Sequence, residues 1–286
     1  MSRLPVAKTY KLFIGGAFPR SESGRVYDVT SPSGEFIANA SKASRKDARD
    51  AVVAARGAVA KWSGATAYNR GQVMYRIAEM LEGRAAQFVD EIQKSTGVSA
   101  KDVTTEVNAA IDLLVWYAGW TDKYAQVVGG ANPVAGPFFN LSVPEPSGVA
   151  FLVAPQSEST LLGLVAAIAP ALVTGNTVVV LSSESSPCAA MSFAEVVATS
   201  DVPGGVVNIL TGSPAEIAPW MASHQDVNSL DLSGADAELA VACERDAAET
   251  LKRVIRPGQF SATVGSVNRI GAFVETKTVW HTKSLS

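Results

Sequence analysis

The side chains best able to attack a substrate covalently are two cysteines, Cys188 and Cys243. Cys188 follows Pro187 at the start of an expected helix, and a helix N-terminus can lower the pKa of a thiol enough to make it reactive. Cys243 lies inside an alanine-rich helical pattern. Free cysteines more often pack as small apolar side chains, so we interpret both as inert and keep a reactive Cys188 as the alternative.

The two histidines, His224 and His281, have no cysteine or second histidine nearby at ligand spacing, so the sequence predicts no metal site. We interpret His224 as a residue that holds a loop, because nothing near it in the sequence completes a proton relay. Two cysteines do not make a disulfide framework, and a reducing, cytoplasmic setting is therefore the expectation.

Three candidate binding residues follow the ends of apolar segments. Glu184 could accept hydrogen bonds from a ribose diol, and a solvated acid at a strand end is the alternative. Gly212 fits a turn that needs a positive φ. Gly234, at an expected helix start, could let a phosphate group approach the backbone. The sequence thus predicts at most a nucleotide site without a G-x-G-x-x-G motif.

These residues would be positioned by strands and helices that alternate from Gly148 onward. The apolar segments GVAFLVAP, TVVVL, VVNIL and SLDLS are typical of buried strands, and helical patterns separate them. This order predicts a doubly wound α/β fold whose parallel sheet is covered on both faces. Three helices are expected before it, the first of which begins at a capping box of Ser44 and Asp47.

Two further segments, PFFNLSVPEP and RIGAFVETKTVWHT, alternate like strands. Two strands are marginal alone, so we expect them to pair with each other and with another subunit. The residues expected at this interface are Phe139, Leu141, Val143, Val274, Thr276, Thr278 and Trp280.

The composition excludes several classes of protein. A formal net charge of −3 leaves no basic excess for nucleic acid. The longest apolar stretch, Leu161 to Val173, is too short to span a bilayer, so no membrane association is expected. The N-terminal residues lack the apolar core of a signal peptide.

Several segments, in order, resemble the aldehyde dehydrogenase family. IAPALVTGNTVVVLSSESSP is similar to the family signature APALAxGNTVVxKPSExTP, and DVPGGVVNILTG is similar to GLPPGVVNxVTG. SHQDVNSLDLSGA matches the segment that ends in FTGS, and RIGAFVETKTVW resembles the C-terminal assembly strand. The resemblance implies a Rossmann-like cofactor domain with a β assembly element.

The departures from the family pattern fall on its functional positions. Ser157 stands where the family has the oxyanion-hole Asn, Leu181 replaces the Lys that reaches the adenosine ribose, and Ala235 replaces the Ser of FTGS. The general-base Glu falls where this chain reads RPGQ from Arg256, and the catalytic Cys domain that should follow is absent. Glu184 and Gly234 remain from the family pattern.

The resemblance therefore implies a degenerate family member. We expect a Rossmann-like unit at residues 1–128 and 147–258 and a β oligomerisation element at 129–146 and 259–286. The expected function is a non-catalytic subunit, like the inactive second half of two-domain aldehyde dehydrogenases, that pairs with a full-length enzyme, with itself or with both. No cofactor is expected, although NAD is possible. An NAD-binding oxidoreductase subunit and a nucleotide-sensing module are the alternatives.

Overall fold

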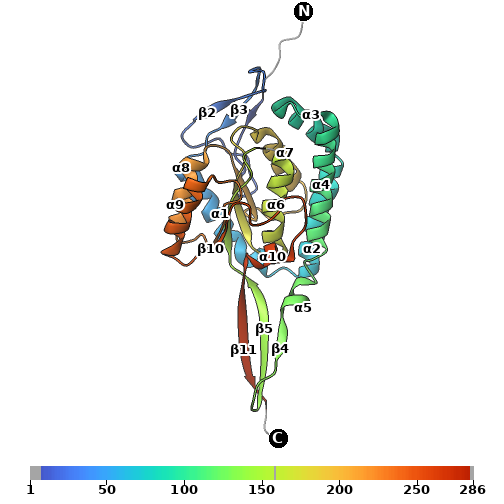
Figure 1. The fold of residues 1–286 in the computed structure, drawn as a ribbon, viewed down its shortest axis with the longest axis vertical. Coiled ribbons are helices and arrows are strands. Elements are labelled where there is room, and N and C mark those ends of the chain that lie inside the picture. Colours follow the sequence, from blue (N-terminus) through green and yellow to red (C-terminus); the bar gives the residue numbers. More distant parts are fainter. Residues whose placement is uncertain (1–7, 158, 284–286) are drawn as a thin grey trace, which may run out of the picture.

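The centre of the protein is a parallel sheet of five strands. The structure, a computed structural model, describes residues 8–157 and 159–283. The strands lie in the order β10-β9-β6-β7-β8 and all pair in parallel (Figure 1). Their bounds are β6 (Val149–Val153), β7 (Thr177–Leu181), β8 (Val207–Leu210), β9 (Ser229–Asp231) and β10 (Arg253–Ile255). The expected Rossmann-like α/β fold is confirmed.

Helices cover both faces of this sheet. One face packs against α1 (Arg45–Ser63), α8 (Pro214–Ser223) and α9 (Ala237–Ala248). The opposite face packs against α6 (Thr160–Val173) and α7 (Pro187–Ala198), which are covered in turn by α2 (Ala67–Glu82), α3 (Ala85–Thr96) and α4 (Ala100–Ala118). Helix α6 is buried along its whole length because α2 and α4 cover the side that faces away from the sheet. This explains why its sequence is apolar all round.

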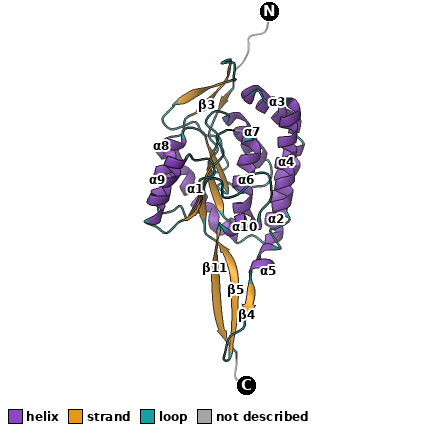
Figure 2. Cartoon of the chain, in the orientation of Figure 1, coloured by secondary structure: helices purple, strands orange, loops and turns teal. Residues whose placement is uncertain are grey.

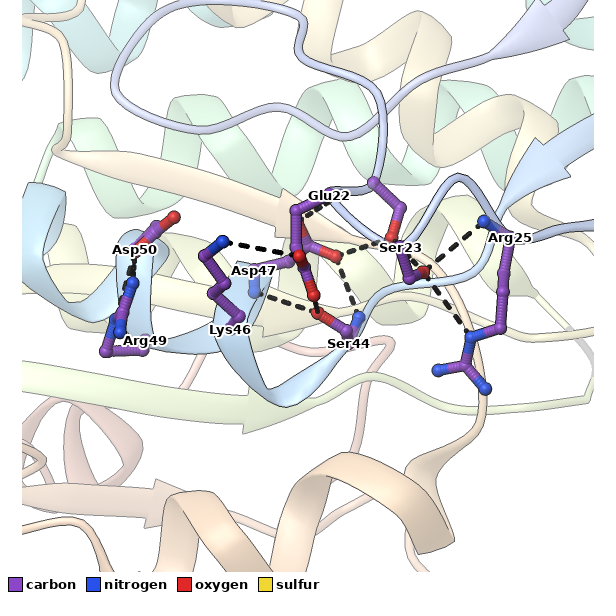
Figure 3. Close-up of polar contacts among 9 residues, drawn as sticks. Glu22, Ser23, Arg25, Ser44, Lys46, Asp47, Arg49 and Asp50 are labelled. Carbon is purple, nitrogen blue, oxygen red and sulfur yellow. Dashed lines mark hydrogen bonds and ion pairs between the residues drawn. The ribbon is translucent and has the colours of Figure 1, made fainter.

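A network of polar contacts fixes the start of α1. The predicted capping box is present: the Ser44 Oγ accepts from the Asp47 N–H at 3.2 Å, and Asp47 accepts in return from the Ser44 N–H at 2.8 Å. Glu22 joins the same network through Ser44 and Lys46 (Figure 3). These contacts attach the N-terminal segment, with β1 (Thr9–Tyr10), β2 (Val26–Thr30) and β3 (Phe36–Ser41), to the body.

A three-stranded antiparallel sheet projects from the body as an arm (Figures 1 and 2). It contains β4 (Gly130–Asn132), β5 (Phe138–Pro146) and β11 (Val274–Thr282), and α5 (Tyr124–Val128) leads into it. The predicted pairing of the two β segments is confirmed, because β11 pairs with β5 from Val274 opposite Pro146 to Thr282 opposite Phe138. The second segment of the predicted β element began at residue 259, whereas its strand, β11, begins at Val274. The outermost residues, 1–7 and 284–286, lie outside the described residues.

The residues expected at an interface fall into three places. Leu141 lies opposite Val279, so Phe139, Leu141 and Val143 share one face of the arm with Val279. The residues Thr276, Thr278 and Trp280 lie on the other face. Val274 differs from the expectation, because its side chain is buried with Phe273 in the core at the base of the arm and cannot pack against a partner.

Residues 256–273 connect β10 to the arm and pack against the body. Gly265 lies so close to the Trp116 indole that a Cβ there would be 2.3 Å from a ring atom. The short helix α10 (Val267–Gly271) carries Arg269, whose Nη2 is 2.7 Å from the Asp231 Oδ2 at the end of β9. Both side chains are buried, with 3% and 0% of their surface exposed. A buried ion pair therefore joins the connection to the sheet.

We predict that Arg269→Met lowers the free energy of unfolding by about 3–5 kcal/mol, because it leaves the buried Asp231 carboxylate without its cation. The double variant Asp231→Leu with Arg269→Met should recover most of that loss, since no buried charge remains. Urea denaturation measures both values.

The matched control is Arg253→Met, which breaks the exposed ion pair with Glu275 and should cost no more than about 1 kcal/mol. Equal losses for the Arg269 and Arg253 variants would show that the buried pair does not hold the fold together.

No described helix is long and apolar enough to cross a membrane.

Candidate functional site

The carboxyl edge of the parallel sheet is where a doubly wound fold binds its ligands. Ser157 follows β6, Glu184 follows β7 and Gly234 follows β9, and these three strands are adjacent. The structure therefore brings these three predicted residues to one edge. Gly212 follows the outer strand β8 and lies beside the N-terminal segment, where an added Cβ would be 3.3 Å from the Ala43 nitrogen.

The amide of Gln156 joins the ends of β6 and β7. Its Nε2 donates to the Ala154 carbonyl at 2.6 Å, and its Oε1 accepts from the Glu184 N–H at 3.0 Å. The Gln156 carbonyl accepts from the Ser183 hydroxyl at 2.8 Å. The Gln156 side chain thus satisfies backbone groups on both sides of this junction, including the Glu184 N–H.

Gly234 serves close packing between β6 and β9. A Cβ at this position would be 1.9 Å from the Ala154 carbonyl oxygen and 2.8 Å from the Pro155 nitrogen. The Gly234 N–H donates to the Val153 carbonyl at 2.9 Å. The contact of the two backbones explains the glycine without a phosphate group, so the retained residue is not by itself a sign of nucleotide binding.

Helix N-termini at this edge hold the chain's own carboxylates. The Glu106 Oε1, from α4, accepts from the Leu161 and Leu162 N–H groups of α6 at 2.9 and 3.2 Å. Asp236 caps α9 by accepting from the Leu239 N–H at 2.8 Å. Because helix N-termini attract anions, these carboxylates occupy places where a phosphate would bind and repel it by like charge.

Helix α8 also carries an acidic side chain in its first turn. Glu216 contacts Lys42 and lies 3.5 Å from the Arg25 Nη2, and the hydrogen bond from Lys42 holds the pKa of this carboxyl below its usual range. The cations from the N-terminal segment are therefore already paired with an acid of this chain.

Leu181 and Ala235, two of the positions that depart from the family pattern, belong to the apolar core. Leu181 is fully buried at the end of β7, and Ala235 is 9% exposed at the start of the α9 segment. Neither residue presents a polar atom to the carboxyl edge. Ser157 is exposed there and has a hydroxyl where an amide donor was expected.

The two cysteines are buried in surroundings that disfavour the thiolate form. Burial raises the pKa of Cys188 to about 11, and it raises the pKa of Cys243 to about 11 as well. A thiol with such a pKa is protonated near neutral pH and is a poor nucleophile. His224 accepts from the Asp226 N–H through its Nδ1 at 3.1 Å, which agrees with its interpretation as a loop residue. No group of acidic, histidine or cysteine side chains among the described residues could hold a metal ion.

Sequence reasoning missed four residues that decide the chemistry of this edge: Glu106, Gln156, Asp231 and Arg269. Asp231 gave a usable signal, since an acid inside the apolar segment SLDLS needs a cation or several donors. Glu106 and Gln156 gave none, because their partners lie far away in the sequence.

The described cavities lie elsewhere. One of about 470 Å³ is lined by α2 and the end of α4, including Tyr68 and Tyr75, and one of about 670 Å³ lies beside β10 and α9. None of the five cavities described for residues 8–157 and 159–283 is lined by Ser157, Glu184 or Gly234.

Comparisons with known proteins agree with this geometry. A sequence model of the aldehyde dehydrogenase family matches residues 18–256. The D-glyceraldehyde dehydrogenase (NADP(+)) of Thermoplasma acidophilum is 31% identical over 87% of this chain and 50% of its own length. An omega-crystallin of Enteroctopus dofleini is 30% identical over 88% and 51%. The chain thus spans about half the length of the curated relatives it matches.

Solved structures also match this chain over about half of their own length. A betaine aldehyde dehydrogenase mutant from Staphylococcus aureus, in complex with NAD+, aligns with a TM-score of 0.82 at 25% identity, over 87% of this chain and 50% of that one. The HpcC of Thermus thermophilus aligns with a TM-score of 0.82 at 29% identity, over 86% and 47%.

We predict that Glu106→Gln changes the pH dependence of stability. Burial raises the pKa of Glu106 above its ordinary value of about 4.3, so its contribution to stability is greatest at low pH and falls as pH rises through the folded-state pKa. The stability of the variant relative to the unaltered chain should therefore increase between about pH 4 and pH 7. Urea denaturation at several pH values measures this, and a constant difference would contradict the assignment.

Proposed function

The chain belongs to the aldehyde dehydrogenase family, and from that premise we propose that it is a non-catalytic member that serves as a structural or regulatory subunit. The observation that carries this proposal is the connection between β10 and the arm. It consists of residues 256–273, which pack against the body and lead directly into β11. The resemblance places the family's nucleophile domain at this point, and the connection leaves no room for one.

The remaining groups support the same conclusion. Arg256 begins the segment RPGQ, where the resemblance places the family's general-base Glu, and its guanidinium donates to both Glu244 carboxylate oxygens at 2.8 and 3.0 Å. A guanidinium has no lone pair available to accept a proton, so it cannot act as a base. Covalent catalysis needs an activated nucleophile, and both cysteines are buried with raised pKa values.

We further propose that the chain binds NAD weakly or not at all. The solved relatives with bound NAD+ make a nucleotide site possible in this fold. Against it, α6 and α9 are capped by Glu106 and Asp236, and the ribose-directed Lys is Leu181. An NAD-binding oxidoreductase subunit and a nucleotide sensor are the second candidates, and both rest on the retained Glu184.

The proposed partner is a full-length aldehyde dehydrogenase subunit, a second copy of this chain, or both, joined through the strands of the arm in the cytoplasm. Support comes from the arm itself, which projects from the body (Figure 2) and exposes Phe139 of its middle strand and Trp280 of its edge strand. A sheet with an unpaired edge and exposed apolar side chains is an aggregation hazard unless a partner covers it.

The purified chain should not oxidise aldehydes. The expected result is no NADH formation with a panel of aldehydes, because no described residue supplies an activated thiolate. Sustained turnover of any aldehyde would overturn the non-catalytic proposal. If turnover also survived changing Cys188 and Cys243 to Ser, the nucleophile would have to be another residue.

Calorimetric titration should give a dissociation constant for NAD well above the micromolar range. Losing a charged hydrogen bond costs about 1.5–3 kcal/mol, or roughly one to two decades of affinity. Asp236→Asn keeps a helix cap but removes its charge, so it should bind NAD more tightly than the unaltered chain if the carboxylate repels the phosphate. Micromolar or tighter binding by the unaltered chain would favour the NAD-binding candidate.

A further inference from the structure

Strand β11 has one edge without a partner among the described residues. It is the outermost strand of the arm, in the order β11-β5-β4 (Figure 1). At its two ends the Ser147 N–H donates to the Phe273 carbonyl, and the Lys283 N–H donates to the Pro137 carbonyl. In an antiparallel pair the hydrogen-bonded positions alternate. The odd-numbered residues of β11 therefore bond to β5, and the N–H and C=O groups of the even-numbered residues point outward.

These outward groups belong to five residues in an unbroken strand: Val274, Thr276, Thr278, Trp280 and Thr282. Proteins usually protect such an edge with a proline, a bulge, a very short strand or charged side chains. The charged side chains Glu275 and Lys277 of β11 are paired with Arg253 and Glu145 of the same chain. The edge of β11 has no proline, and its register with β5 shifts nowhere between Val274 and Thr282. The opposite edge of the arm is the short β4, Gly130–Asn132. The backbone N–H and C=O groups along this long edge are therefore available to pair with another strand.

We propose that this edge pairs with β11 of a second copy of the chain, antiparallel, about a two-fold axis at Thr278. The inference rests on the proposed assembly role of the arm and specifies its partner. With Thr278 opposite itself, Val274 lies opposite Thr282 and Thr276 lies opposite Trp280. Each of these pairs joins even-numbered residues, so this register satisfies the outward N–H and C=O groups of both strands along their full length.

The side chains fit this register as well. Trp280 is 57% exposed, and the partner's Thr276 would cover it as an aromatic and β-branched pair. Glu275 faces the partner's His281 twice, once on each side of the axis, so the imidazole lies beside a carboxylate that Arg253 of its own chain already contacts. Because the arm projects from the body and the strands run antiparallel, the two bodies lie at opposite ends of a shared strand about 30 Å long (Figure 2).

Cysteine cross-linking tests the register. Residues directly opposite in a hydrogen-bonded antiparallel pair have Cα atoms about 5.5 Å apart, within reach of a disulfide. Thr278→Cys should give a covalent dimer under a mild oxidant such as diamide. Thr276→Cys alone should not, whereas a mixture of Thr276→Cys and Trp280→Cys should cross-link. The native Cys188 and Cys243 are buried, so the unaltered chain is the background control.

A second set of variants tests the edge without relying on cross-linking. Thr278→Pro removes an outward N–H but no bond to β5, so light scattering should show the loss of the dimer with the arm intact. Thr278→Ala keeps the outward N–H and loses the side-chain methyl and the hydroxyl that contacts Ser142, so it should remain dimeric. At position 281, His281→Glu should weaken the dimer, because it places a second carboxylate opposite Glu275.

A monomeric unaltered chain, or a dimer that Thr278→Pro leaves unchanged, would overturn the inference. A chain that is monomeric alone but binds a full-length dehydrogenase through the arm would also overturn it while leaving the proposed function standing. Aldehyde turnover is measured separately and would reject the proposed function without bearing on the register.

Discussion

The ion pair between Asp231 and Arg269 is the contact on which the remaining structure depends. An acid inside a buried strand is costly unless donors surround it. Here the Asp231 Oδ1 accepts from the Ser233 N–H and hydroxyl at 2.9 and 2.5 Å, and Arg269 supplies the cation at 2.7 Å. Arg269 can reach it only because residues 256–266 bring α10 back against the body. The pair thus fixes the path of the connection.

The direction of the arm follows from the same contact. Four residues after Arg269, the buried Phe273 accepts from the Ser147 N–H at 3.0 Å and from the Asn176 Nδ2 at 2.9 Å through its carbonyl. Strand β11 then begins, and Arg253 holds its base through two hydrogen bonds to Glu275 at 2.5 and 2.8 Å. Replacing Arg269 alone would leave the buried Asp231 carboxylate unpaired beside α10 and so weaken the anchor of β11. The arm is therefore attached to the sheet through α10.

The sequence predicted the parts of the fold that depend on local pattern. The apolar strands, the capping box of Ser44 and Asp47, and the pairing of the two β segments all followed from periodicity or short spacing. Contacts between residues that are far apart in the sequence were not predicted. Glu106 and Leu161 are 55 positions apart, and Gln156 and Glu184 are 28 apart, so neither pair forms a pattern in the sequence. The close packing of Gly234 against Ala154 was not predicted either, because only the fold reveals how near the two backbones lie.

The central claim is that residues 256–273 complete the fold at the point where the family has a further domain. Amide hydrogen exchange of the intact chain tests it most directly, because exchange separates segments that open locally from those that open only on global unfolding. The account predicts that peptides covering α10 and Phe273 exchange as slowly as those of β6. Exchange of α10 within seconds, while β6 stays protected, would contradict it.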